Sequence, residues 1–250
     1  MRLLIVADYD ELSVRAAEMV AEAIAWKPNI VLGLATGGTP GGCYRELVRM
    51  HRERGLSFAK VATFNLDEYL RLPPSHVQSY RYYMDENLFN LVDVKRENIH
   101  FLDGLTMDPE RTCREYENAI KASGGIDFQL LGIGSNGHIA FNEPSSSFQS
   151  RTRVISLSEQ TRNDNARFFH SLDEVPRQAL TMGIATILEA RVILLLASGV
   201  GKAEAVAKSV EGSVTEMVPA SILRTHINCT MLVDRDAAVK LTMQSLSSQG

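Results

Sequence analysis

The stretch Phe128-Gln-Leu-Leu-Gly132-Ile-Gly-Ser-Asn-Gly137-His138 decides the fold class of this chain. It starts as a short apolar run and continues into a glycine-rich segment, which is typical of a buried strand that ends in a loop. Similar apolar runs occur along the chain, and their lack of polar alternation favours strands covered on both faces. These runs are Arg2–Ala7, Ile30–Ala35, Val61–Asn65, Ile99–Leu102, Phe128–Ile133, Arg191–Ala197 and Asn228–Asp234.

Helical patterns separate these runs. In Leu12–Ala25 the apolar residues recur at helical spacing, and Asp108–Lys121 has a proline where a helix would start. Tyr44–Met50 and Lys202–Val210 show the same spacing. The alternation of strands and helices predicts one α/β domain over residues 1–250, with a mostly parallel Rossmann-like sheet and helices on both faces.

One region, about residues 144–176, differs from this pattern. It is polar and rich in serine, asparagine and arginine, so we expect irregular structure there. In a parallel-sheet enzyme, an insertion of this kind near the strand ends is a candidate lid over the ligand.

Composition excludes several classes of protein. A 250-residue chain with 45% hydrophobic residues buries a substantial core, and a net charge of -4 offers no basic face for nucleic acid. Cys43, Cys113 and Cys229 are few and odd in number, and without a Cys-x-x-Cys pair they favour a reducing cytoplasm and no metal site. The apolar run Leu3–Ala7 is too short for a signal peptide or a membrane span, so we expect a cytoplasmic protein without a membrane partner.

A turn rich in glycine and threonine, residues 36–42, follows the predicted strand Ile30–Ala35. At the start of a helix, such a turn offers bare backbone N–H groups and the positive end of the helix dipole, which suit a phosphate. No Gly-Lys-Ser/Thr closes the turn, so it is not a Walker A loop, and the phosphate of a small metabolite fits better than ATP. A glycine-rich connection without a ligand is the alternative.

Two adjacent carboxylates, Asp67 and Glu68, come directly after the predicted strand Val61–Asn65. Because side chains alternate in direction, we expect the two carboxylates to face different environments. One is a candidate base in the cleft and the other a candidate structural group, and the sequence leaves open which is which.

The glycines of residues 132–137 also have the spacing of a dinucleotide-binding turn. Such a turn continues into a long helix, whereas Pro144 comes too soon for one here. His138 and Glu143 favour another interpretation. A lone histidine is more often structural, but an imidazole held by a carboxylate in one loop can move protons on a polar small molecule.

Three motifs resemble those of the glucosamine-6-phosphate deaminase (glucosamine-6-phosphate isomerase) family. They are Thr36-Gly-Gly-Thr-Pro40, Phe64-Asn-Leu-Asp-Glu-Tyr69 and Gly134-Ser-Asn-Gly-His-Ile-Ala-Phe-Asn-Glu-Pro144, with further matches at 150–153, 161–162, 165–169, 179–183 and 201–202. The resemblance covers essentially the whole chain. The related 6-phosphogluconolactonases typically follow Gly-His with Thr-Ala-Ser instead.

The resemblance implies an isomerising deaminase of amino sugar catabolism that converts glucosamine 6-phosphate and water to fructose 6-phosphate and ammonia, without a cofactor or metal. It implies that Asp67 accepts the C2 proton during enolisation and that His138, with Glu143 and Asn136, opens the sugar ring. The expected partner is the small amino sugar phosphate, and monomer and homo-oligomer both stay open. The residues that it assigns to substrate binding are Thr36, Gly37, Gly38, Thr39, Arg167 and Lys202.

Two positions depart from the family pattern. Asn136 stands where some members have an aspartate, and because asparagine cannot relay a proton as a carboxylate does, ring opening would depend on His138 and Glu143. Ile155 stands where the allosteric branch has a lysine, so we expect little or no activation by N-acetylglucosamine 6-phosphate. A sugar-phosphate lactone hydrolase, which needs no C2 base, and a sugar-phosphate-sensing regulator fit the sequence less well.

Overall fold

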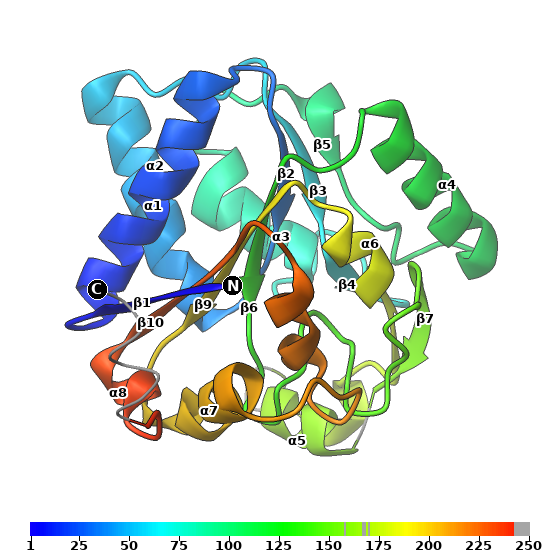
Figure 1. Ribbon diagram of the computed structural model, residues 1–250. Helices are drawn as coiled ribbons and strands as arrows, with labels where there is room; N and C mark the ends of the chain where they lie inside the picture. Colours follow the sequence, from blue (N-terminus) through cyan, green and yellow to red (C-terminus); the bar gives the residue numbers. More distant parts are fainter. Residues whose placement is uncertain (158, 167–168, 170, 243–250) are drawn as a thin grey trace.

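The apolar runs expected to be strands form one seven-stranded sheet in which all strands are parallel (Figure 1). The structure is a computed structural model that describes residues 1–157, 159–166, 169 and 171–242. In spatial order the strands are β1 (Arg2–Val6), β10 (Cys229–Asp234), β9 (Val192–Ala197), β6 (Phe128–Gly132), β2 (Val31–Leu34), β3 (Ala62–Asn65) and β5 (Ile99–His100). The predicted parallel sheet is confirmed.

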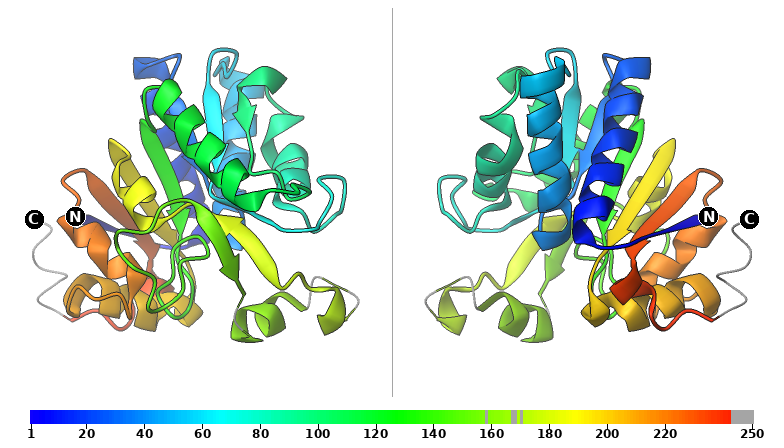
Figure 2. Two further views of the ribbon diagram at one scale, coloured as in Figure 1. Left: turned by 90° about the vertical axis from the view of Figure 1, so that its right-hand side faces the viewer. Right: turned by 90° about the vertical axis from the view of Figure 1, so that its left-hand side faces the viewer.

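Helices cover both faces of this sheet (Figure 2). One face carries α1 (Tyr9–Trp26), α2 (Gly38–Arg54), α3 (Tyr80–Met84) and the π-helical turn Asp85–Phe89, and the other carries α4 (Pro109–Ala122), α6 (Ile184–Leu188), α7 (Ala203–Glu211) and α8 (Arg235–Ala238). Residues of β9 alternate between the two layers: Leu194 and Leu196 pack with the first set of helices, and Ile193 and Leu195 with the second. This two-sided burial explains why the strands are continuous apolar runs.

Helix α2 is longer than the sequence pattern predicts. The spacing predicts a helix only over Tyr44–Met50, whereas α2 begins at Gly38 and ends before Gly55, which adopts a left-handed φ of 70°. The sequence pattern did not predict the start of α2 because that segment is rich in glycine, which is a poor helix former. One of them is required by packing, since a Cβ at Gly42 would lie 2.0 Å from Oγ of Ser13 on α1.

A second, smaller sheet was not predicted. It is antiparallel and consists of β4 (Asp67–Tyr69), β8 (Gln178–Thr181) and β7 (Arg153–Ser156). The expectation that residues 144–176 are irregular is therefore wrong in part, because they contain β7, α5 (Glu159–Ala166) and the 3₁₀ turn Leu172–Glu174. In Figure 2 this segment extends away from the main sheet. Strand β7 is only four residues long and none of its residues is fully buried, so it lacks the apolar run that marks the strands of the main sheet.

Further 3₁₀ turns are Arg96–Asn98, Val200–Lys202 and Pro219–Thr225. Cys43, Cys113 and Cys229 are buried and form no disulfide. Within the described part of the chain, no helix combines the length and apolar character needed to cross a membrane. Those same residues contain no group of three or more histidine, cysteine, aspartate or glutamate side chains placed to hold a metal ion.

Candidate active site

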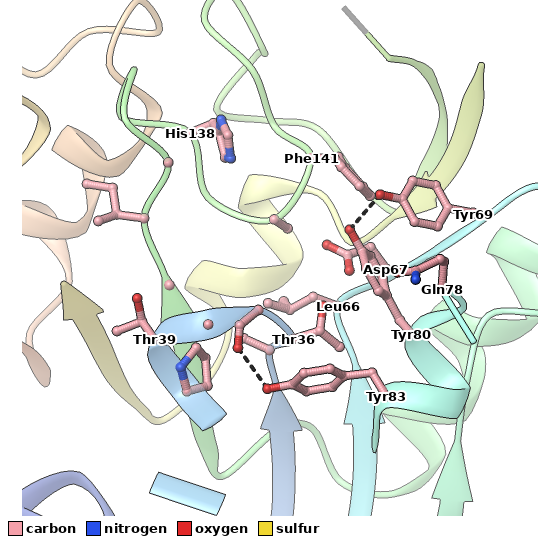
Figure 3. A pocket seen from close by; sticks show the side chains of 18 of the residues that line it. Thr36, Thr39, Leu66, Asp67, Tyr69, Gln78, Tyr80, Tyr83, His138 and Phe141 are labelled. Atoms are coloured by element: carbon pink, nitrogen blue, oxygen red, sulfur yellow. Dashed lines mark hydrogen bonds between the residues drawn. The ribbon is translucent and has the colours of Figure 1, made fainter. Parts of the chain in front are cut away.

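A cavity of about 510 Å³ lies where β2, β3, β6 and β9 end at their carboxyl edges. Open parallel sheets bind ligands at this edge. The cavity brings together the turn Thr36–Thr39, Asp67, His138 and Lys202, which come from four separate parts of the sequence. Figure 3 shows Thr36, Asp67 and His138 around the same open space.

The turn Thr36–Thr39 places the start of α2 against the cavity. Gly37 has a φ of 113°, which glycine adopts readily, and it caps the helix without a side-chain hydrogen bond. The first N–H groups of a helix have no partner within it, and the helix dipole is positive there. The turn therefore offers backbone donors and partial positive charge to an anion.

Lys202 adds a full positive charge to this end of the cavity. It is half-buried and ends the 3₁₀ turn that leads into α7. Asp234, at the end of β10, holds the preceding loop: its carboxylate accepts hydrogen bonds from the backbone N–H of Gly199 at 3.0 Å and from the hydroxyl of Ser198. The remaining predicted cation, Arg167, lies outside the described residues.

The side chain of Asp67 lines the cavity and is 7% exposed. It follows Leu66, at the point where the chain leaves the main sheet at β3 and enters the smaller sheet as β4. Burial, and second the neighbouring charge of Glu68, raise the pKa of Asp67 from 3.8 to about 8. A carboxylate with this pKa is a much stronger base than an ordinary aspartate.

Glu68 points away from the cavity and is 2% exposed. Its carboxylate accepts the backbone N–H groups of Tyr69 at 2.9 Å, Tyr80 at 3.0 Å and Arg81 at 2.9 Å. Burial raises the pKa of Glu68, and these hydrogen bonds act in the opposite direction. Glu68 thus holds the start of α3, which answers the question that the sequence left open about the two adjacent carboxylates.

His138 lies in the loop after β6, and no long helix follows Gly137. The dinucleotide-turn interpretation is therefore excluded. The imidazole packs directly over Gly134, where a Cβ would lie 2.2 Å from Cε1 of His138. Glycine is required at this position because any side chain would displace the ring.

A carboxylate and an amide lie behind the imidazole. Nδ1 of His138 is 3.5 Å from Oε1 of Glu143, within ion-pair range but long for a hydrogen bond. Nδ2 of Asn136 donates to Oε2 of Glu143 at 2.7 Å, and Oδ1 of Asn136 accepts the backbone N–H of His138 at 3.2 Å. Glu143 and Asn136 are absent from the cavity lining, whereas His138 borders the cavity.

The cavity has an aromatic wall that was not predicted from the sequence. Tyr80 stacks on Phe141 with ring centroids 5.9 Å apart, and its hydroxyl donates to the hydroxyl of Tyr69 at 3.2 Å. Phe169 meets Tyr69 edge-on at 6.2 Å. Figure 3 shows Tyr69, Tyr80 and Phe141 beside Asp67. Tyr69 and Phe141 lie within the family motifs and Tyr80 lies in a cluster of tyrosines at residues 80–83, but nothing local in the sequence indicates that they meet.

Comparisons with known proteins agree with this geometry. A family model described as glucosamine-6-phosphate isomerases/6-phosphogluconolactonase matches residues 7–232. Glucosamine-6-phosphate deaminase from Thermoanaerobacter sp. (strain X514) is 50% identical over 238 residues, which is 95% of this chain and 94% of that protein. The Clostridium acetobutylicum protein of the same name is 51% identical over 241 residues, covering 96% of this chain and 100% of that one.

Solved structures agree as well. The structure of a monomeric glucosamine-6-phosphate deaminase matches with a TM-score of 0.94 and 50% identity, over 96% of this chain and 100% of that one. A 6-phosphogluconolactonase from Trypanosoma cruzi shares the fold, with a TM-score of 0.78 at 21% identity over 96% of this chain and 97% of that one. The chain belongs to the glucosamine-6-phosphate isomerase/6-phosphogluconolactonase family.

Proposed function

We propose that this chain is a glucosamine-6-phosphate deaminase, which converts glucosamine 6-phosphate and water to fructose 6-phosphate and ammonia. The observation that carries the proposal is the shared cavity: the turn Thr36–Thr39 at a helix start, a buried carboxylate with a pKa of about 8 and an imidazole with Glu143 behind it meet at one space. Relatives about half identical over nearly the whole chain have this name.

The substrate phosphate binds at the turn Thr36–Thr39. The N–H groups at the start of α2 and the threonine hydroxyls donate to its oxygens, and Lys202 contributes charge. We place Arg167 beside it on the basis of the sequence alone. Anchoring the phosphate holds the sugar carbons at a set distance from Asp67 and His138, which is worth more to catalysis than the binding energy by itself.

We assign the proton transfers of ring opening to His138. The closed sugar must lose the proton of its C1 hydroxyl and gain one on the ring oxygen, and an imidazole can do both near neutral pH. Glu143 stabilises the imidazolium that forms, and Asn136 holds Glu143 in place through the 2.7 Å hydrogen bond.

Asp67 then transfers the C2 proton to C1. It removes the proton as a carboxylate, leaving an enolamine, and returns it to C1, which leaves an imine at C2. Water adds to C2 and ammonia leaves, giving the ketose. With a pKa of about 8, Asp67 keeps the transferred proton long enough to return it, whereas a carboxyl of ordinary pKa would release it readily.

The test is a coupled assay of the purified protein. Glucosamine 6-phosphate should release ammonia and fructose 6-phosphate in equal amounts. Unphosphorylated glucosamine should react far more slowly, because nothing anchors it at the turn. Hydrolysis of 6-phosphogluconolactone without any ammonia release from glucosamine 6-phosphate would refute the proposal and favour the lactonase branch of the family.

Further properties follow from the same proposal. We place the enzyme in the cytoplasm, acting on a small amino sugar phosphate without nucleic acid or membrane partners, and as one domain with residues 144–176 as a lid. A relative is described as monomeric, and light scattering of the purified chain tests whether this one is too. Since Ile155 replaces a charged residue of the allosteric branch, rate curves should be hyperbolic with or without N-acetylglucosamine 6-phosphate.

A further inference from the structure

Two consecutive backbone carbonyl groups of the turn Thr36–Thr39 each accept a hydrogen bond from a tyrosine hydroxyl. Tyr83, on α3, donates to the carbonyl of Gly37 at 2.7 Å, and Tyr9, the first residue of α1, donates to the carbonyl of Gly38 at 2.8 Å. Figure 3 shows the hydrogen bond from Tyr83 reaching the turn from below Asp67. The two hydroxyls come from helices that are far apart in the sequence.

These contacts determine where two backbone donors point. In a trans peptide the C=O and the following N–H lie in one plane and point in opposite directions. The carbonyl of Gly37 shares its peptide with the N–H of Gly38, and the carbonyl of Gly38 shares its peptide with the N–H of Thr39. Holding each carbonyl therefore turns the adjoining N–H away from the tyrosines.

Those two N–H groups are at the start of α2. Gly38 and Thr39 are its first two residues, and both line the cavity. The next residue is Pro40, which has no N–H to donate. With Gly37 at the N-cap, the helix start offers the N–H groups of Gly37, Gly38 and Thr39, and the tilt of two of these three depends on the peptides that the tyrosines hold.

The hydroxyl of Tyr9 makes its hydrogen bond where α1 packs against α2. Its hydroxyl also accepts the N–H of Gly42 at 2.8 Å, so it bridges the carbonyl of Gly38 and the N–H one helical turn later. A Cβ at Gly42 would lie 2.9 Å from this hydroxyl, which leaves no room for a larger residue. Burial raises the pKa of Tyr83, which keeps that hydroxyl protonated and able to donate.

We propose that Tyr9 and Tyr83 are positioning residues that orient the backbone donors of Gly38 and Thr39 toward a phosphate monoester. Tyr9 is absent from the cavity lining and acts only through the turn, whereas Tyr83 also borders the cavity. The identification of that monoester as the phosphate of glucosamine 6-phosphate rests on the proposed function.

The experiment compares Tyr83→Phe, Tyr9→Phe and the double variant with wild type. Each single change should weaken binding of inorganic phosphate, measured by calorimetry, by about three- to tenfold, the loss expected for one hydrogen bond. KM for glucosamine 6-phosphate should rise by a similar factor, while kcat stays within about twofold because the reacting carbons keep their partners. The effects of the two changes should multiply if each tyrosine holds its own peptide.

Tyr82→Phe is the matched control. Tyr82 neighbours Tyr83 on α3, does not line the cavity, and its hydroxyl makes no hydrogen bond to any residue that the structure describes. This variant should bind phosphate as wild type does. Melting temperatures show whether a variant is folded, and if Tyr9→Phe is not, Tyr83→Phe alone decides the question.

The outcomes separate this inference from the proposed function. Unchanged phosphate affinity in folded Tyr83→Phe, or a fall in kcat with unchanged KM, overturns the positioning role even if wild type is an active deaminase. A wild type that binds phosphate through these tyrosines but releases no ammonia leaves the positioning role intact and overturns the deaminase proposal.

Discussion

Asp67 and Glu68 are adjacent in the chain, but their carboxylates lie on opposite sides of β4. Asp67 faces the cavity, whereas Glu68 accepts three backbone N–H groups and holds the start of α3. The alternation of a strand thus directs one carboxylate into the cavity and the other to the helix that carries Tyr80 and Tyr83.

Asp67→Asn should abolish deamination. Asparagine has nearly the same shape but cannot accept the C2 proton, so kcat should fall by about 10²- to 10⁴-fold. Steady-state kinetics measure the loss, and the affinity for inorganic phosphate, which should change little, serves as the control. Turnover within tenfold of wild type would remove Asp67 from the role of base.

The same variant should be more stable than wild type, by an amount that depends on pH. Burial and Glu68 raise the pKa of Asp67 from 3.8 to about 8, so between these values the folded state binds more protons than the unfolded chain. The free energy of unfolding of wild type therefore falls as pH rises through this window. Asparagine does not titrate, so the gain in melting temperature should be small near pH 4 and grow toward pH 8. A gain that is constant with pH would contradict the raised pKa.

Glu68→Gln should move the pH profile of kcat/KM. The proposed reaction needs Asp67 ionised in the free enzyme, so the rate of wild type should rise with pH up to about 8, the pKa of this carboxyl. Removing the charge of Glu68 lowers that pKa, and the rising limb should move to lower pH. The variant should also melt at a lower temperature, because one amide oxygen replaces a carboxylate that accepts three N–H groups. An unmoved limb would show that burial alone raises the pKa of Asp67.

Asn136→Asp should make ring opening depend on pH. The amide of Asn136 lies 2.7 Å from the carboxylate of Glu143, and two carboxylates this close share one proton at low pH and repel each other once both ionise. The kcat of the variant should approach that of wild type at low pH and fall about tenfold at high pH. Asn136→Ala, which adds no charge, should lose activity without this additional fall in kcat at high pH. A variant with the wild-type profile would show that the hydrogen bond is not part of the relay.

Gly134→Ala should displace the imidazole of His138. The new Cβ would lie 2.2 Å from Cε1 of His138, so the ring must move, and a displacement of this order costs about 10²-fold in kcat. The same methyl at Gly132 would meet no atom within 4 Å and should cost much less. Equal losses in the two variants would show that the loop backbone, and not the ring position, is being perturbed.

The parts predicted correctly from the sequence are those set by local patterns. The strands of the main sheet are recognisable because burial on both faces makes each one a continuous apolar run, as in Val192–Ala197. The start of α4 at Pro109 is recognisable because proline suits the first turn of a helix, and Asp108 caps it by accepting the N–H of Arg111 at 3.0 Å. The turn Thr36–Thr39, Asp67 and His138, which the sequence places after predicted strands, line one cavity, because the carboxyl ends of parallel strands meet at one edge of the sheet.

The small sheet and the aromatic wall could not be predicted in this way. Strands β4, β7 and β8 are three or four residues long, and β7 pairs with β8 through contacts that no short window of sequence contains. Tyr80 and Phe141 stack although they are 61 residues apart, and the motif that contains Phe141 does not indicate this contact.

The sequence by itself determined the parallel sheet, the glycine-rich turn Thr36–Thr39 and the loop of His138, because each depends on residues that are close together in the chain. Only the tertiary structure decided that Asp67 and not Glu68 faces the cavity, because the answer depends on where α3 packs. It also showed that the hydroxyls of Tyr9 and Tyr83 meet the carbonyls of the turn, since these contacts arise only when α1 and α3 pack around the start of α2.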